Sequence, residues 1–157
     1  MSAAVPLMAG KKGLVMGIAN ERSLAWGIAK AVAAHDAELA VTYQGEVMEK
    51  RVRPLAEQLR ASLVMPADVT DPGSLDALFA TIAEQWRRLD FVVHAIAYAD
   101  KEELKGKYLD TSAGNFQKSL LISCYSFTDL CRRAAPPTSS IVVLRFKGEL
   151  YSFHFRM

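Results

Sequence analysis

The sequence predicts an α/β fold with a doubly wound parallel sheet of about five strands. Short apolar segments alternate along the chain with longer segments of helical periodicity. Strands separated by long helices form right-handed βαβ units, and these units build one parallel sheet. A ligand binds such a sheet beyond the carboxyl ends of its strands, and here we expect it between the first and the fourth strand.

The expected strands are apolar runs, and the expected helices are the amphipathic segments between them. The strands are predicted at 12–16, 38–43, 62–66, 89–96 and 140–146, and the helices at 23–34, 46–60, 72–88 and 112–133. Pro54 should kink the second helix or mark a frayed turn, because proline lacks the amide hydrogen that a helix interior uses.

The third and fourth helices carry apolar faces. Asp71 and Pro72 are expected to cap the third helix. Its buried face is predicted to consist of Leu75, Leu78, Phe79, Ile82 and Trp86, and the fourth helix repeats Phe116, Leu120, Cys124, Phe127 and Cys131 at helical spacing. The two cysteines lie about 10 Å apart along that helix, too far for a disulfide. We expect them to be core thiols in a reducing compartment.

Composition and charge limit the classes of function that this chain can have. The 157 residues fit one domain, with 51% hydrophobic and 23% charged residues and a formal net charge of +2. No block of like charges suggests nucleic acid or an anionic membrane as a partner. No apolar run approaches a membrane span, and the N-terminus lacks a signal pattern, so we expect a cytoplasmic protein. His35 and His154 are isolated, and no metal site is expected.

A glycine-bearing turn follows the first expected strand. Gly17 ends the apolar run, Ile18 and Ala19 begin the turn, and Ser23 opens a helix of small residues that includes Gly27. A helix N-terminus after such a turn can bind a pyrophosphate through its free amide groups. The spacing differs from G-x-G-x-x-G. The Ser23 hydroxyl equally suits the N-cap of the helix.

Two further strand ends carry polar side chains. Gln44 follows the second strand, and no Arg or Lys comes before Lys50 and Arg51, which favours NADH over NADPH. Asp68, followed by Val69, ends the third strand and could accept a hydrogen bond from an adenine amino group. A solvated Gln44 and an Asp68 that caps its own turn are the alternatives.

The fourth strand ends in small residues. Ala95, Ile96 and Ala97 leave room for a ribose and a nicotinamide ring, and His94 precedes them. A lone histidine at a strand end is more often structural than catalytic, and both roles stay open here.

Together these segments resemble the NADH-dependent enoyl-acyl-carrier-protein reductases of bacterial fatty acid synthesis, a divergent branch of the short-chain dehydrogenase/reductase superfamily. The matching pieces are Gly17-Ile18-Ala19, Ser23-Leu24-Ala25-Trp26-Gly27-Ile28-Ala29, Ala40-Val41-Thr42-Tyr43-Gln44, Asp68-Val69, His94-Ala95-Ile96-Ala97 and Ser123-Cys124-Tyr125-Ser126-Phe127. The resemblance runs over about 11–144. It implies a Rossmann-type domain at 11–146, after a flexible lead-in at 1–10.

The resemblance also implies NADH as the cofactor and an enoyl thioester on acyl carrier protein as the substrate. The implied NADH site consists of Gly17, Ile18, Ala19, Ser23, Leu24, Gln44, Asp68, Val69, Ala95, Ile96 and Ala97, and Ala99 would lie near the acyl group. Ala97 stands where relatives often have Gly, so its methyl group is expected to crowd the cofactor or to alter a backbone angle.

The resemblance stops at the divergent tail 147–157. After the fifth strand the family has a Tyr, then a second Tyr that stabilises the enolate oxygen, then a Lys that holds the nicotinamide ribose. Here Phe146 stands at the first position and no lysine follows Tyr151. We therefore assign no catalytic residue and do not expect turnover. The family's C-terminal strands are missing, so 140–146 should be a sheet edge, and the alternating tail could pair as a strand or remain exposed.

Three functions remain open from the sequence: a reductase, a module that binds NAD(H) without catalysis, and a structural chain that forms a homo-oligomer through its long helix or its open sheet edge.

Overall fold

The computed structural model is an α/β sandwich that describes residues 6–135, 141–147 and 149–155. One six-stranded sheet has the order β3-β2-β1-β4-β5-β6. Its strands are β1 (Lys12–Met16), β2 (Glu38–Tyr43), β3 (Leu63–Pro66), β4 (Phe91–His94), β5 (Ile141–Lys147) and β6 (Glu149–Phe155). The first five run parallel. This confirms the predicted Rossmann-like fold.

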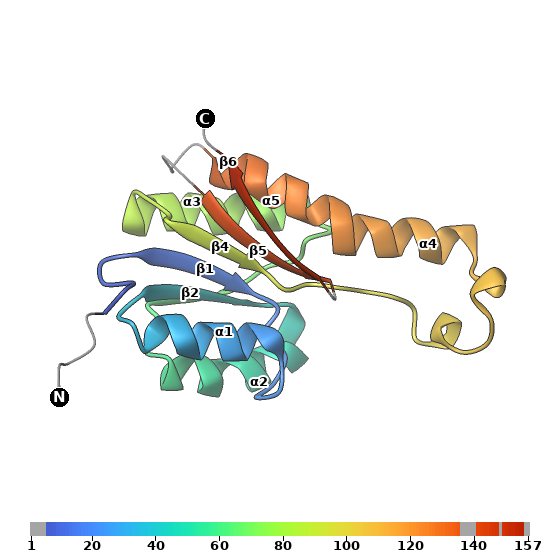
Figure 1. Cartoon of the computed structure of the whole chain (residues 1–157), viewed down its shortest axis with the longest axis horizontal. Helices are drawn as coiled ribbons and strands as arrows, with labels where there is room; N and C mark the ends of the chain where they lie inside the picture. The colour runs from blue at the N-terminus through green and yellow to red at the C-terminus, as the bar shows by residue number, and fades with distance from the viewer. Residues whose placement is uncertain (1–5, 136–140, 148, 156–157) are drawn as a thin grey trace.

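Helices cover both faces of the sheet (Figure 1). On one face lie α1 (Leu24–Ala33) and α2 (Gly45–Gln58), and on the other lie α3 (Pro72–Trp86) and α5 (Ser126–Ala134). The long predicted helix is composed of α4 (Ala113–Leu120), the π-helical turn η3 (Leu121–Tyr125) and α5. Its α4 end extends past the sheet, where it follows an arm that holds the short helices η1 (Glu102–Leu104) and η2 (Tyr108–Asp110).

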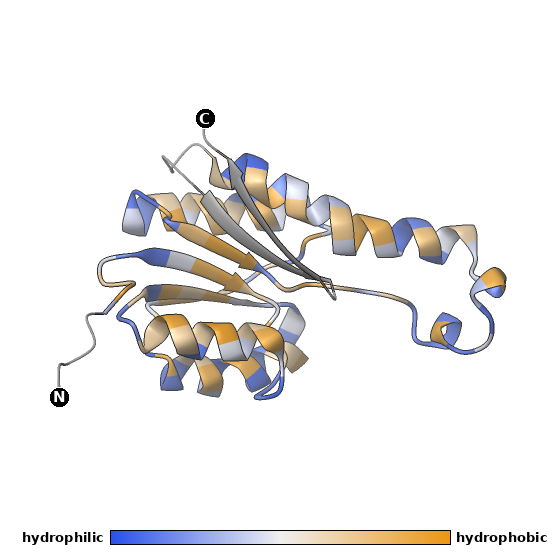
Figure 2. Cartoon of the chain, viewed as in Figure 1, coloured by the Kyte–Doolittle hydropathy of each residue, from blue (hydrophilic) through white to orange (hydrophobic). Residues whose placement is uncertain are grey.

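Two hydrophobic cores result from the alternation of side chains along the strands. Leu14 and Met16 point into the core beneath α3 and α5, whereas Val15 points into the core beneath α1 and α2. Figure 2 shows the central strands as largely hydrophobic, as expected for a sheet buried on both faces. All five residues predicted for the apolar face of α3 are buried.

Left-handed residues set the ends of two helices. Arg87 has a φ of 57° and stops α3 before the predicted end at 88. Arg60 has a φ of 53° just beyond α2. Helix α2 continues through Pro54 to Gln58. The Asp71 side chain caps α3 as predicted, by accepting a hydrogen bond from the Gly73 amide at 2.9 Å.

Strand β4 is shorter than the predicted 89–96 because it pairs with β1 only from Phe91 to His94. The residues that follow leave the sheet at its carboxyl edge. The N-terminal lead-in is held in place near its end, since the Met8 amide donates a hydrogen bond to the His35 carbonyl at 3.0 Å. Residues 1–5 lie outside the described part of the chain.

The expectation that 140–146 forms a sheet edge is wrong. β6 pairs antiparallel with β5, with Val143 opposite Phe153, so β6 is the outer strand and the tail pairs rather than hanging free. The sheet therefore has six strands where five were expected, and its last strand reverses direction. Residues 140, 148, 156 and 157 lie outside the described residues.

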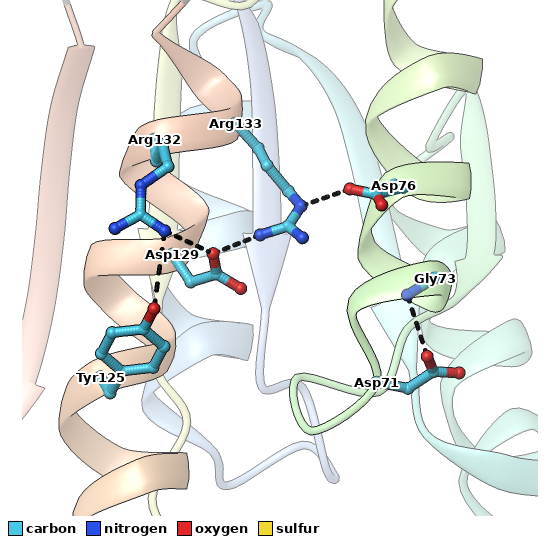
Figure 3. A network of polar contacts seen from close by, with 7 residues as sticks. All are labelled: Asp71, Gly73, Asp76, Tyr125, Asp129, Arg132 and Arg133. Atoms are coloured by element: carbon cyan, nitrogen blue, oxygen red, sulfur yellow. Dashed lines mark hydrogen bonds and ion pairs between the residues drawn. The ribbon is translucent and has the colours of Figure 1, made fainter.

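An ion-pair network connects the two helices on the second face (Figure 3). Arg133 on α5 donates to Asp76 on α3 at 2.7 Å and also pairs with Asp129 on its own helix. Asp129 in turn contacts Arg132, which reaches the Tyr125 hydroxyl. The Arg133 side chain is largely buried and Asp76 is exposed, and this pair joins α5 to α3.

The prediction that both cysteines are core thiols is wrong. Cys124 and Cys131 are reduced cysteines of intermediate exposure. The reason is that the apolar face of the long helix is only partly covered: Phe116 and Leu120 on α4 are 49% and 40% exposed. Burial raises the pKa of the Cys131 thiol, which keeps it protonated at neutral pH.

Replacing Ile82 by alanine should remove a fully buried side chain from the α3 core. We expect the free energy of unfolding to fall by about 2–5 kcal/mol, because the surrounding core cannot collapse into the cavity. Urea unfolding monitored by circular dichroism measures this loss. Glu84→Ala on an exposed position of the same helix is the matched control and should change stability by less than about 0.5 kcal/mol.

Candidate functional site

A cavity of about 500 Å³ opens at the carboxyl edge of the sheet, where the strand order reverses between β1 and β4. The turn after β1, the end of β2, the loop after β3, the exit of β4 and one side of α4–η3 form its walls. The lining residues are Gly17, Ile18, Ala19, Thr42, Tyr43, Gln44, Met48, Ala67, Val69, Thr70, Ala95, Ile96, Ala97, Tyr98, Lys118 and Ile122. This is the position that the doubly wound topology predicts.

Gly17 brings the exits of β1 and β4 into direct contact. Its φ is +101°, and a Cβ atom at this position would lie 2.1 Å from the Ala95 carbonyl oxygen. The Ala95 amide donates to the Met16 carbonyl at 3.1 Å beside it. Only glycine permits both the backbone conformation and the approach. The result is a cavity floor made of backbone.

The loop 17–23 presents amide groups at the start of α1. Ser23 occupies the N-cap position but its side chain does not cap the helix, contrary to expectation. Its hydroxyl donates to the Asn20 carbonyl at 2.7 Å and accepts from the Ala19 amide at 3.4 Å, so it braces the loop instead. Leu24 is 60% exposed and lies outside the cavity lining.

Gln44 and Asp68 meet across the ends of β2 and β3. The Gln44 Nε2 donates to the Asp68 Oδ2 at 2.9 Å, and Thr70 donates to the other oxygen through its amide at 2.8 Å and its hydroxyl at 2.7 Å. Burial raises the pKa of Asp68, but these hydrogen bonds outweigh it and hold the pKa below its ordinary value. Gln44 and Val69 line the cavity, and Asp68 stands behind them.

Two serines of the long helix fix the exit of β4. The Tyr98 amide donates to the Ser123 hydroxyl at 2.9 Å, and that hydroxyl returns a bond to the Tyr98 carbonyl at 3.3 Å. One turn later, Ser126 lies 2.8 Å from Nε2 of His94, which is fully buried. His94 does not line the cavity, and its contact with Ser126 favours the structural role among the two that the sequence left open. The π-helical turn places both serines toward the strand.

Ala97 adopts no unusual backbone conformation. Among the residues that the structure describes, positive φ outside glycine occurs only at Asp36, Arg60 and Arg87. Ala97 therefore lies outside the left-handed region that favours glycine. The methyl group stays in the cavity wall, where it narrows the space beside Ile96.

A second cavity of about 530 Å³ lies beyond Tyr98 and shares Ala97 and Tyr98 with the first. Ala99 lines it, together with residues of the arm and of α4. The arm is held by hydrogen bonds from the Ser112 amide and hydroxyl to Glu103 and from the Asp100 amide to Asn115. The two cavities adjoin at the β4 exit.

Most residues predicted for the cofactor site line one cavity: Gly17, Ile18, Ala19, Gln44, Val69, Ala95, Ile96 and Ala97. Ser23, Leu24 and Asp68 do not line it. Sequence reasoning missed Thr42, Tyr43, Met48, Ala67, Thr70, Tyr98, Lys118 and Ile122. Most of these residues lie next to predicted strand ends, and this position could have indicated them. No local sequence signal placed Lys118 and Ile122 at the cavity.

Across the described part of the chain, no group of three or more His, Cys, Asp or Glu side chains could hold a metal ion. No helix within those residues is long and apolar enough to cross a membrane.

Fold and site together define a Rossmann-like α/β protein with its cavity at the topological switch point. The chain belongs to the enoyl-(acyl carrier protein) reductase family, whose family model matches residues 17–152. This confirms the resemblance seen in the sequence.

Similar proteins agree with this membership. Enoyl-acyl-carrier-protein reductase (NADH) 2 of Rhizobium meliloti strain 1021 is 57% identical over 147 residues, which cover 92% of this chain and 55% of the relative. The FabI enoyl-acyl-carrier-protein reductase (NADH) of Rickettsia felis is 51% identical over 145 residues, which cover 90% of this chain and 56% of the relative. The chain thus spans about half the length of the curated relatives it matches.

Solved structures show the same backbone. The reductase of Anaplasma phagocytophilum in complex with NAD has a TM-score of 0.83 and 55% identity, covering 87% of this chain and 53% of that one. FabI from Candidatus Liberibacter asiaticus has a TM-score of 0.84 and 47% identity, covering 90% and 56%.

Gly17→Ala should destabilise the protein by about 1–3 kcal/mol, because it forces a Cβ atom into the Ala95 carbonyl at a positive φ. Gly27→Ala is the matched control: nothing lies within 4 Å of the added Cβ, and the site is inside α1. It should stabilise by about 0.5–1 kcal/mol. Thermal unfolding of both variants checks the pair. Equal effects would contradict the close contact at Gly17.

Asp68→Asn should make stability less dependent on pH. The lowered native pKa of Asp68 means that its ionised form stabilises the fold above about pH 4, the ordinary range of an aspartate pKa. This stabilisation is lost as pH falls through the native pKa. Urea unfolding should therefore show wild type more stable than the variant at neutral pH, with the difference shrinking near pH 3. A difference that is constant with pH would contradict it.

Proposed function

We propose that this chain binds NADH as the nucleotide half of an enoyl-acyl-carrier-protein reductase. The observation that carries the proposal is the cavity at the switch point, where the Gly17 turn, Gln44 and the small β4 exit residues meet. An NAD-bound relative of the same backbone supports it.

The lining fits a dinucleotide. The Gly17 turn removes side-chain bulk where phosphates would approach the amides at the start of α1. At the ends of β2 and β3, hydrogen bonds from Gln44 and Thr70 hold the Asp68 carboxylate in place. Its oxygens are acceptors and the Gln44 amide is a donor, which suits an adenosine group. Lys50 and Arg51 do not line the cavity, which supports NADH over NADPH.

The adjoining cavity supports the enoyl thioester of acyl carrier protein as the substrate. When bound, NADH supplies the hydride for reduction of such a thioester. Ala97 and Tyr98 form the boundary between the two cavities, so their small and flat side chains set how closely two ligands approach. Ala99 lies on the substrate side of this boundary.

We propose no catalytic residue in these 157 residues. The sequence contains no lysine after Lys147, and the family's second Tyr and its Lys find no match there. Removing one stabiliser of a developing oxyanion costs about 10²–10³ in rate. The proposal for these residues is therefore limited to cofactor binding.

Self-association is a second candidate function, favoured by one observation. Phe116, Leu120, Leu121 and Tyr125 form an apolar strip along α4 and η3, each at least 40% exposed. A strip of this kind on a soluble surface is typical of an interface, and a second copy of the chain has the same strip to offer. Size-exclusion chromatography with light scattering tests it, and a clean monomer would rule it out.

Isothermal titration calorimetry should show NADH binding at micromolar Kd, about −8 kcal/mol. NADPH should bind more weakly, because no basic side chain lies beside Gln44 in the cavity wall. A parallel assay with crotonyl-coenzyme A should show no loss of NADH absorbance. Absence of heat with NADH would overturn the binding function, whereas clear turnover would overturn the assignment of a module without catalysis.

A further inference from the structure

Lys118 is the single charged side chain in the lining of the cofactor cavity. It comes from the last turn of α4, the helix that extends past the sheet in Figure 1. Its Nζ atom lies 4.7 Å from the centre of the Tyr98 ring. Within the described residues, no carboxylate lies within ion-pair distance of it.

The position of this ammonium group is prearranged. Attraction between a cation and the face of an aromatic ring holds Lys118 against Tyr98. Tyr98 is itself fixed, because Ser123 bonds both its amide and its carbonyl. A long, flexible side chain is thus tied to the rigid exit of β4 at the edge of the cavity.

The rest of the cavity provides no competing charge. Asp68 is absent from the lining, and its carboxylate accepts hydrogen bonds from Gln44 and Thr70. Arg22 and Arg51 line a neighbouring depression between the Gly17 loop and α2, which shares Ala19 with the cofactor cavity but does not bring either arginine into its lining. A ligand that carries phosphates into this cavity therefore meets one formal positive charge.

We propose that Lys118 is a positioning residue that attracts and orients the phosphates of the bound dinucleotide from the wall opposite the Gly17 loop. This inference rests on the proposed NADH-binding function. The loop amides bind the phosphates by directional hydrogen bonds, and Lys118 contributes a positive charge from the cavity lining, whereas Glu21 and Arg22 of the loop lie outside that lining. Because Lys118 is exposed, its contribution is sensitive to salt.

Calorimetric titration of four chains with three probes tests the role. The chains are wild type, Lys118→Gln, Lys118→Arg and Lys101→Gln, and the probes are NADH, ADP and adenosine. Lys101 is the matched control, since it is exposed, carries the same charge and lies outside both cavity linings. Circular dichroism confirms that each variant is folded.

We expect Lys118→Gln to weaken NADH and ADP binding about fivefold and adenosine binding less than about twofold. Lys118→Arg should restore most of the affinity, and Lys101→Gln should change little. The difference between wild type and Lys118→Gln should vanish as NaCl is raised from about 20 to about 300 mM.

Equal losses for adenosine and NADH would overturn the inference, since they would show contact with the adenosine group or a structural effect. The same loss in Lys101→Gln would overturn it by showing that only net charge matters. If wild type binds NADH and Lys118→Gln binds it equally well, the inference fails while the proposed function stands. If wild type binds none of the probes, both fail together.

Discussion

The contact between the exits of β1 and β4 is the constraint on which the rest of the site depends. Gly17 lies against the Ala95 carbonyl so closely that no side chain fits between them. The chain leaves β1 toward α1 and leaves β4 toward the arm. The two segments therefore diverge beyond Gly17, and the cavity opens between them. Two parallel strands that are neighbours in the sheet and far apart in sequence therefore build one floor.

A second set of interactions holds the other wall in place, and it comes from the long helix. Ser126 meets His94 and Ser123 meets Tyr98, so the helix is joined to β4 at two successive points. The π-helical turn between α4 and α5 contains Ser123, and Ser126 follows directly after it. Such turns recur at functional sites in other proteins. Arg133 and Asp76 then connect the α5 end of the same helix to α3.

Local sequence patterns predicted the layers of the fold well, since burial on both faces leaves continuous apolar strands such as Phe91–His94. They also predicted the cavity residues at strand ends, because parallel topology brings those ends together. Local patterns failed where contacts between distant parts of the chain determine the structure. The antiparallel β6 depends on β5 offering a free edge, and the Ser23 hydroxyl turned to Asn20 rather than to its own helix. Lys118 could not be placed, because its approach to the cavity depends on the angle at which α4 leaves the sheet.

The antiparallel β6 has a consequence for any longer version of this fold. The outer edge of β5 offers one set of backbone hydrogen-bonding groups, and β6 uses them from Lys147 back to Ile141. A further parallel strand of a doubly wound sheet would need that same edge. β6 and a further parallel strand cannot pair with this edge of β5 at the same time. A fragment that supplied further parallel strands would first have to displace β6 from β5.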